Sequence, residues 1–324
     1  MIFLAGDIGG THTRLLLGES RADGWKTLAR ADYPSARFER FEDILRQFLA
    51  NARPTPAIMA LAVAGPVRGE SVRITNLPWI LDAGALRDDF AVRRVILLND
   101  FEAQGLALPT LAAADLITLQ SGQPEPDGVR ALIGAGTGLG MTQVIACGEG
   151  WRVVPGEGGH TDFAPGNETE LELWRHLRAI VGRASVEHVL SGPGIERIYR
   201  YLCRQDGYPA ERVGAAAISE AALANPDGPE REALRLFVQI YGAVAGNLAL
   251  LSLPYGGLFV GGGIAPKIRP LLAQEGFMTR FLDKAPMQAL LQRIPVYLIR
   301  NTDLGLQGAA AVATQPERFG FGRR

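Results

Sequence analysis

Short apolar runs that stop at glycine, proline or a polar pair recur along this chain, a pattern typical of strands that alternate with helices and loops. Residues 58–64 are almost wholly apolar and stop at Gly65-Pro66, and residues 95–98 form a second such run that stops at Asn99-Asp100. Runs without polar alternation are typical of strands buried on both faces. We therefore expect a sheet covered by helices on both sides.

Other segments have the helical period. One face of residues 38–50 carries four large apolar side chains, those of Phe41, Ile44, Leu45 and Phe48. We predict further helices after the caps Asn167 and Ser191, across residues 229–253, and across 304–313, which we expect to return to the first domain. Residues 119–130 predict a surface loop, and residues 316–324 a frayed tail.

Two glycine-rich turns follow apolar strands. The first is Gly6-Asp7-Ile8-Gly9-Gly10-Thr11, after residues 2–5, and the second is Gly134-Ala135-Gly136-Thr137-Gly138-Leu139-Gly140, after residues 131–133. Glycine lets backbone N–H groups approach an anion closely, because no Cβ shields them. Each turn also precedes strand-like sequence. The pattern predicts two loops that bind one phosphate chain, in an enzyme built from two related halves.

Length and composition limit the classes of protein to which the chain can belong. The 324 residues suffice for two α/β domains, with 47% apolar and 21% charged residues. The formal net charge of −1 favours neither nucleic acid nor an anionic membrane as a partner. Cys147 and Cys203 are too few for a disulfide framework. Residues 236–253 resemble a membrane span, but their polar residues favour a buried helix, and no basic region precedes the apolar start, so we expect no signal peptide.

Three common nucleotide motifs do not occur. No glycine is followed by lysine, so there is no P-loop. A dinucleotide fingerprint would need glycine where Leu139 or Met141 stands. The His-Arg-Asp loop of protein kinases is also missing. Another phosphate-binding architecture is needed.

Six motifs, which follow one another along the chain, indicate such a phosphate-binding architecture. They are the first turn with Arg14, residues 98–101 around Asn99-Asp100, the second turn, the stretch 155–160 with Glu157 and His160, residues 190–194, and residues 259–264 with Gly261-Gly262-Gly263. Together they resemble bacterial glucokinases, members of the hexokinase and actin-like ATPase superfamily, over about residues 2–313.

The resemblance implies an α/β fold of two RNase H-like (actin-like ATPase) domains, with the active site in the cleft between them. We expect a small domain of residues 1–108 plus 300–324 and a large domain of residues 109–299. The implied activity is ATP-dependent phosphorylation of D-glucose at its 6-hydroxyl, the first step of glucose catabolism, in the cytoplasm. The implied partners are glucose, ATP, Mg²⁺ and a second copy of the chain, with no nucleic acid and no membrane.

The resemblance also assigns nucleotide-binding residues. The phosphate loops would be the first turn (Gly6, Asp7, Ile8, Gly9, Gly10, Thr11) and the centre of the second (Gly136, Thr137, Gly138), and the adenosine contact would be Gly261, Gly262 and Gly263. Threonine hydroxyls suit such loops because they donate to phosphate oxygens. Asp7 would hold Mg²⁺ through water, since magnesium retains several of its waters.

Asn99, Asp100, Glu157, His160 and Glu187 would bind the sugar, and Asp100 would also be the catalytic base. A carboxylate at a strand end is suited to accept the proton of an attacking hydroxyl. Two other interpretations stay open: Asn99-Asp100 forms only a turn, or His160 is a structural histidine. A metal cluster of Glu157, His160 and Asp162 is a third, although its spacing matches no zinc motif.

One position departs from the family pattern. His12 stands where asparagine commonly follows Gly-Gly-Thr, so its role is open. The alternative functions are a kinase for another hexose, such as fructose or mannose, a sugar-sensing regulator without turnover, and an actin-like filament former. We expect no regulator, because the first strand leaves no room for a helix-turn-helix before it. The choice between ATP and polyphosphate as donor is also open.

Overall fold

The computed structural model describes residues 1–22, 24–51, 54–207 and 209–322. They pack as two compact units, residues 1–111, 144–154 and 303–324 in one and residues 112–143 and 155–302 in the other. We call these unit 1 and unit 2 and describe each by itself. The domain boundaries predicted from the sequence stay a prediction beside this division.

Unit 1 is built on a five-stranded sheet with the order β3-β2-β1-β4-β8. The strands are β1 (Ile2–Ile8), β2 (His12–Arg21), β3 (Gly24–Pro34), β4 (Ile58–Val63) and β8 (Arg94–Asn99). β1, β2 and β3 are antiparallel neighbours, whereas β1, β4 and β8 run parallel. A small sheet holds β5 (Val67–Arg68), β6 (Ser71–Arg73) and β7 (Ile80–Asp82).

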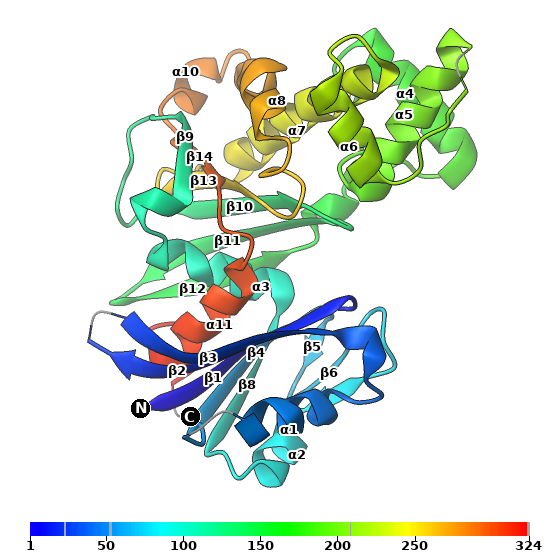
Figure 1. Ribbon diagram of the computed structural model, residues 1–324. Helices are drawn as coiled ribbons and strands as arrows, with labels where there is room; N and C mark the ends of the chain where they lie inside the picture. Colours follow the sequence, from blue (N-terminus) through cyan, green and yellow to red (C-terminus); the bar gives the residue numbers. More distant parts are fainter. Residues whose placement is uncertain (23, 52–53, 208, 323–324) are drawn as a thin grey trace. The chain divides into compact units, whose positions relative to one another are not determined.

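Helices cover both faces of the unit 1 sheet (Figure 1). Leu4, Ile8 and Leu61 pack against α1 (Phe41–Asn51), whose predicted apolar face of Phe41, Ile44, Leu45 and Phe48 is buried. The other face meets α11 (Leu304–Thr314), which also packs on α3 (Asp100–Ala107). The last predicted helix therefore does return to the first unit. The remaining helices are α2 (Ala83–Asp89), η1 (Ser35–Arg37) and η2 (Leu108–Thr110).

Unit 2 contains most of a six-stranded sheet with the order β12-β11-β10-β13-β14-β9. Its strands are β9 (Leu116–Gln120), β10 (Arg130–Ala135), β11 (Leu139–Cys147), β12 (Gly150–Gly156), β13 (Gly257–Gly261) and β14 (Val296–Ile299). Apart from β9, the chain order across this sheet is third, second, first, fourth, fifth, the same as in unit 1. The two related halves that the paired glycine turns predicted are therefore present as two sheets of one topology.

The helices of unit 2 include one long helix, which several of the others contact. They are η3 (Ala113–Asp115), η4 (Gly158–His160), α4 (Glu168–Val181), η5 (Val186–His188), α5 (Gly192–Asp206), α6 (Ala215–Ala224), α7 (Pro229–Ser252), α8 (Arg269–Gln274), α9 (Phe277–Leu282) and α10 (Gln288–Leu291). Asn167 and Ser191 cap α4 and α5 as predicted. Among the described residues, α7 alone is long and apolar enough to cross a membrane, yet 67% of its most apolar window is buried in the protein, as in a core helix.

Three local expectations need correction. Gly24–Pro34 forms strand β3, which the sequence analysis missed because most of its residues are exposed. Leu119 and Gln120 belong to β9 and not to the predicted loop. The tail is not frayed over residues 316–322, since Phe319 is buried and Arg94 donates hydrogen bonds to the carbonyls of Phe321 and Gly322. Residues 323–324 lie outside the described part.

Close backbone packing between α3 and α11 gives a test of unit 1. A Cβ added at Gly308 would lie 1.8 Å from the carbonyl oxygen of Ala103. Gly308→Ala should therefore force the two helices apart and lower the free energy of unfolding by about 2 kcal/mol, measured by urea denaturation. Gly263→Ala is the control, because its methyl would meet nothing within 4 Å. An unchanged unfolding midpoint for Gly308→Ala would contradict this packing.

Candidate active site

The parallel strands of unit 1 bring the predicted residues to one edge of its sheet. Ile8 is paired with Val63, and Val63 with Asn99, so β1, β4 and β8 end side by side. The first glycine turn follows β1, and Asp100 follows β8 as the first residue of α3. Ligands of open α/β sheets bind at this carboxyl edge.

The first glycine turn joins β1 to β2 and is fastened by a serine. The N–H of Gly9 donates to the carbonyl of His12 at 2.9 Å. The hydroxyl of Ser35 donates to the carbonyl of Gly9 at 2.7 Å, and the backbone N–H of Ser35 donates to Thr11 O at 2.9 Å. Ser35 follows the missed strand β3, and for this reason the sequence analysis did not find it.

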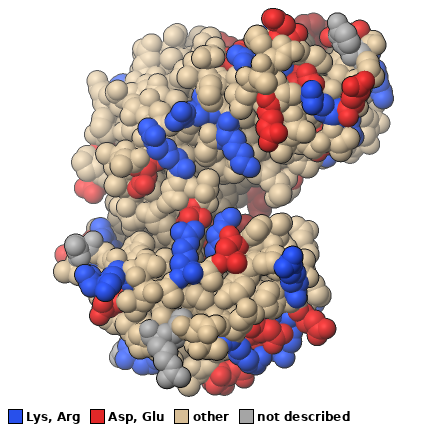
Figure 2. Space-filling view, in the orientation of Figure 1, with Lys and Arg blue, Asp and Glu red and all other residues tan. Residues whose placement is uncertain are grey.

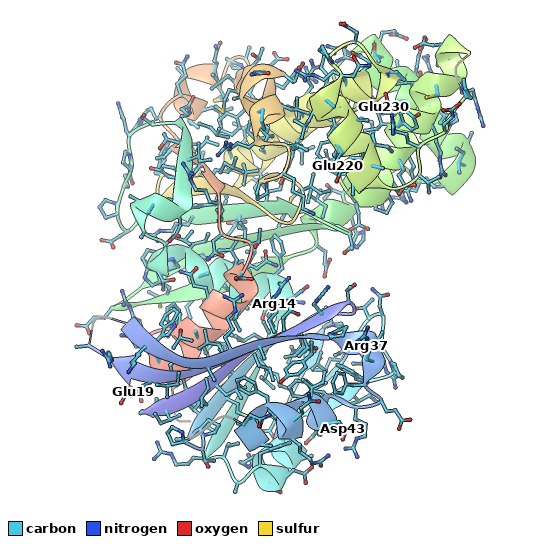
Figure 3. All side chains as sticks on the ribbon, in the orientation of Figure 1. Arg14, Glu19, Arg37, Asp43, Glu220 and Glu230 are labelled. Carbon is cyan, nitrogen blue, oxygen red and sulfur yellow. The ribbon has the colours of Figure 1, made fainter. Side chains whose placement is uncertain are left out.

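Asp7 lies on the α11 face of the sheet, in a cluster of charges. Its carboxylate accepts a hydrogen bond from Arg14 at 3.3 Å. Arg14, which Figure 3 labels, also lies 3.4 Å from Asp32 and 3.8 Å from Asp303, just before α11. The pKa of Asp7 is raised from 3.8 to about 6, mainly by burial; Arg14 opposes the rise, and the negative charges of Asp100 and Asp303 add to it. Asp100 therefore adds negative charge to the surroundings of Asp7.

Asn99 has a structural task in addition to any predicted one. Its side-chain oxygen caps α3 by accepting from the N–H groups of Phe101 and Glu102 at 3.0 and 3.2 Å. Its amide nitrogen donates to the carbonyl of Gly65 at 3.1 Å. One N–H of the amide is left to donate to a ligand. Asn99 therefore begins a helix and not a turn, and its role in sugar binding stays a prediction.

Asp100 is half-buried and stands in the first turn of α3. One of its carboxylate oxygens accepts from the N–H of Phe101 at 2.9 Å. A helix N-terminus favours a negative charge at this place, because the helix dipole and the free N–H groups point toward it. The position suits a carboxylate that must be ionised to accept a proton.

In unit 2 the second glycine turn lies beside the glycine triplet. Gly134, at the end of β10, is paired with Gly261, at the end of the parallel strand β13. Gly262 has a φ of +80°, and a Cβ there would lie 2.4 Å from the carbonyl oxygen of Ala135. Only glycine fits so close to the second turn. The predicted phosphate loop and adenosine contact are thus brought together at one edge of the unit 2 sheet.

The three predicted sugar ligands of unit 2 also gather. Glu157 comes directly before η4 and His160 is its last residue, with 3.9 Å between a carboxylate oxygen and Nε2, and Glu187 lies on η5. The backbones of η4 and η5 are tied by the bond from Val186 N to Thr161 O, 2.9 Å. Burial lowers the pKa of His188; Arg197 lowers it further, and Glu187 and His160 act on it with opposite sign.

The other two interpretations of His160 do not fit. Its side chain is 61% exposed, so it is no satisfied core histidine. In the described part of the chain no three of the His, Cys, Asp and Glu side chains are grouped to hold a metal, which removes the predicted alternative of a Glu157–His160–Asp162 cluster.

His12 has a defined partner. Its Nδ1 lies 2.9 Å from a carboxylate oxygen of Asp32, the same side chain that contacts Arg14. His12 thus joins the charge cluster around Asp7 through Asp32. No local pattern in the sequence points to Asp32 and Asp303, because their partners lie far away in sequence.

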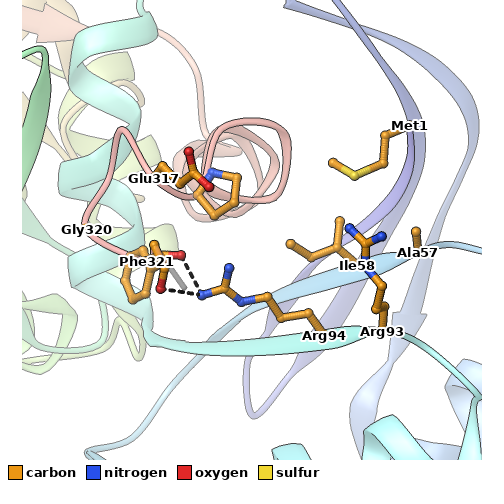
Figure 4. A pocket seen from close by; sticks show the side chains of 10 residues that line it. Met1, Ala57, Ile58, Arg93, Arg94, Glu317, Gly320 and Phe321 are labelled. Carbon is orange, nitrogen blue, oxygen red and sulfur yellow. Dashed lines mark hydrogen bonds between the residues drawn. The ribbon is translucent and has the colours of Figure 1, made fainter. Parts of the chain in front are cut away.

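A large cavity of unit 1 lies at the wrong edge for this chemistry. It has a volume of about 970 Å³ and is lined by Met1, Ile58 and Arg94, at the starts of β1, β4 and β8, and by the tail (Figure 4). The carboxyl ends of the same strands are at the opposite edge. We therefore place the candidate site at the carboxyl edge, where the charge cluster around Asp7 lies.

Comparison with known proteins identifies the family. The family model described as Glucokinase matches residues 4–316. The chain belongs to the glucokinase family. It is 42% identical to a glucokinase of Nostoc punctiforme, covering 97% of this chain and 99% of the relative. The crystal structure of glucokinase from an Antarctic psychrotroph matches with a TM-score of 0.86 and 31% identity over 96% of this chain and 98% of that one. A ROK family glucokinase from Streptomyces griseus, in complex with glucose and AMPPNP, has a TM-score of 0.66 at 20% identity over 97% and 100%. The predicted α/β fold with two actin-like ATPase domains is the fold of these relatives.

The raised pKa of Asp7 gives a test in this glucokinase-family chain. Since the ordinary value is 3.8 and the folded value about 6, the folded state disfavours ionised Asp7. Asp7→Asn should raise the free energy of unfolding by about 2 kcal/mol at pH 7.5. The gain should shrink as pH falls from 6 toward 3.8, because Asp7 then becomes protonated.

Urea denaturation at pH 7.5, 5 and 4 measures this difference. Asp88→Asn is the control, since the Asp88 side chain is 80% exposed. A gain that does not depend on pH, or a loss of stability at pH 7.5, would contradict the burial of a charge at Asp7.

Proposed function

We infer that this chain transfers the terminal phosphoryl group of ATP to the 6-hydroxyl of D-glucose. Its membership of the glucokinase family supports the activity. The observation that supports the assignment of the base is the place of Asp100, at the carboxyl edge of three parallel strands and next to the charge cluster of Asp7. Phosphoryl transfer depends on positioning the reactants and on stabilising the charge of the transferred group. The carboxyl edge of the sheet offers groups for both tasks.

Asp100 is the proposed catalytic base. As the 6-oxygen of glucose attacks the γ-phosphorus, the hydroxyl proton passes to the carboxylate of Asp100. The bond between the γ-phosphorus and the oxygen that bridges it to the β-phosphorus breaks, and ADP leaves. A base in this position contributes about 10²–10⁴ to the rate.

The glycine turns are the proposed phosphate loops. Gly10 and Thr11 of the first turn and Thr137 and Gly138 of the second offer backbone N–H groups, and the two threonines add hydroxyl donors. The N–H groups of Gly9 and Gly136 instead hold the turns in shape, since they donate to the carbonyls of His12 and Gly138. A Cβ at Gly136 would meet nothing within 4 Å, so the space beside it is open to a ligand. Gly261, Gly262 and Gly263 are the proposed adenosine contact. Gly6 and Ile8 belong to β1 and position the first turn, and a Cβ at Gly6 would lie 2.8 Å from Leu61.

Mg²⁺ fits the acidic residues near the first turn. Asp7 offers carboxylate oxygens, the type of donor that magnesium prefers, and Asp100 and Asp303 add negative charge to its surroundings without forming a three-carboxylate cage with it. Arg14 already occupies one side of the Asp7 carboxylate, which suits a contact through water rather than a dedicated cage. When bound, the ion supplies positive charge to the phosphates. Because Asp7 must be ionised to attract it, binding competes with a proton.

The proposed sugar ligands combine acceptors and donors. Glu157 and Glu187 accept hydrogen bonds from sugar hydroxyls, His160 donates or accepts, and Asn99 donates through its free N–H. A site of this kind rejects an epimer because the wrong hydroxyl leaves buried polar groups unpaired.

Our proposal also includes a homodimer in the cytoplasm, with no nucleic-acid or membrane partner. Basic and acidic side chains are interspersed on the face shown in Figure 2.

Formation of ADP with a panel of hexoses tests the function. Purified protein with ATP and MgCl₂ should turn over glucose with a kcat/KM at least tenfold above those for mannose and fructose. A preference for another hexose would favour the alternative kinase. Stable glucose binding without ADP formation would favour a sugar-sensing protein, and filaments that sediment with ATP would favour the actin-like alternative. Polyphosphate in place of ATP tests the donor.

Asp100→Asn tests the base. The amide keeps the shape and the hydrogen-bonding capacity toward sugar, so glucose should bind within about threefold of the wild-type affinity. The amide accepts no proton, so kcat should fall by about 10²–10⁴. Isothermal titration with glucose and a coupled ADP assay measure the two quantities. A kcat within tenfold of wild type would remove Asp100 from this role.

A further inference from the structure

Glu187 is tied to the second phosphate loop as well as lying among the proposed sugar ligands. Its Oε2 accepts a hydrogen bond from the backbone N–H of Leu139 at 2.9 Å. Leu139 is the first residue of β11 and comes directly after Thr137-Gly138. A charged acceptor therefore holds the end of the loop that we assign to the nucleotide.

Gly138 makes room for this contact. A Cβ added at Gly138 would lie 2.5 Å from Oε2 of Glu187 and 3.3 Å from its Cδ. By contrast, a Cβ at Gly136, two residues earlier, would meet nothing. The two glycines thus differ in purpose, since Gly136 leaves open space and Gly138 admits the carboxylate of Glu187.

The segment that carries Glu187 holds the loop at a second point. The N–H of Gly192, at the start of α5, donates to the carbonyl of Gly136 at 2.8 Å. The hydroxyl of Ser191 donates to the carbonyl of Glu187 at 2.8 Å and accepts from the N–H of Gly194 at 3.1 Å. Residues 187–192 and 136–139 are therefore fastened together, and a displacement of one segment is passed to the other.

The second carboxylate oxygen has capacity for a ligand. Oε1 lies 3.9 Å from the position of the Gly138 Cβ, farther than Oε2, and accepts no hydrogen bond from the described residues. The residue is half-buried, and it shares its surroundings with His160, since both act on the pKa of His188. If a sugar hydroxyl donates to Oε1, both oxygens of the carboxylate accept a hydrogen bond.

We propose that Glu187 is a positioning residue that couples the sugar site to the second phosphate loop, with Oε1 for a sugar hydroxyl and Oε2 for the Leu139 amide. The proposal rests on the proposed function and adds to it a physical reason why sugar and nucleotide should strengthen each other's binding. A bound sugar immobilises the carboxylate, and the loop then needs less ordering to bind phosphates. Since such coupling is reciprocal, nucleotide tightens sugar binding by the same factor.

Titration calorimetry with AMPPNP and MgCl₂, with and without saturating glucose, tests the link. In wild type, glucose should tighten AMPPNP binding severalfold. Glu187→Ala should bind AMPPNP about tenfold more weakly even without sugar, because a hydrogen bond to a charged group is lost, and glucose should have no further effect. His160→Ala is the matched control. It should weaken glucose binding, yet keep the wild-type affinity for AMPPNP and its enhancement at saturating glucose.

Two more variants separate the link from a folding defect. Glu187→Gln keeps an oxygen for the Leu139 amide and should restore sugar-free AMPPNP binding to within about threefold of wild type. Gly138→Ala keeps Glu187 but displaces its carboxylate, and should lower AMPPNP affinity and remove the effect of glucose. Wild-type AMPPNP affinity in sugar-free Glu187→Ala would overturn the link. The proposed function would fail separately, through a wild-type protein that forms no ADP with glucose.

Discussion

Three parallel strands that end at one edge of the unit 1 sheet impose the arrangement of its charged residues. β1, β4 and β8 are in register, so the turn after β1 and the helix start after β8 must lie near one another, although about ninety residues separate them in sequence. Helix N-termini and free backbone N–H groups collect at the same edge, which makes it favourable for anions. The sheet of unit 2 repeats this arrangement with β10 and β13, and places two glycine turns side by side.

The edge of unit 1 is not optimised for stability. Asp7 faces α11, and the approach of Gly305 to within 3.1 Å of its carboxylate, measured from an added Cβ, leaves little space for water. The folded protein compensates in part with Arg14, which Asp32 and Asp303 hold from other elements. A buried carboxylate with a raised pKa, kept beside the proposed base, is the kind of local cost that active sites retain for function.

Local patterns predicted the local structure well. The two glycine hairpins, the amphipathic face of α1, the caps of α4 and α5 and the buried strand β4 all depend on neighbouring residues, which the sequence displays directly. The exposed strand β3 lacked such a pattern, and the ordered tail depends on Arg94, more than two hundred residues earlier. The family resemblance named the site residues. The residues that hold them in place could not be predicted in this way, because they act through long-range contacts. Examples are Ser35, which donates to the first turn, and Leu139, whose N–H donates to Glu187.

The role of Asp100 is the central claim of this account, and a crystal structure with glucose, AMPPNP and Mg²⁺ tests it most directly. We predict a carboxylate oxygen of Asp100 within about 2.6–3.2 Å of the 6-oxygen of glucose, with the 6-oxygen facing the γ-phosphate. A complex in which the 6-hydroxyl is bound by another side chain, and Asp100 makes no contact with the sugar, would contradict it.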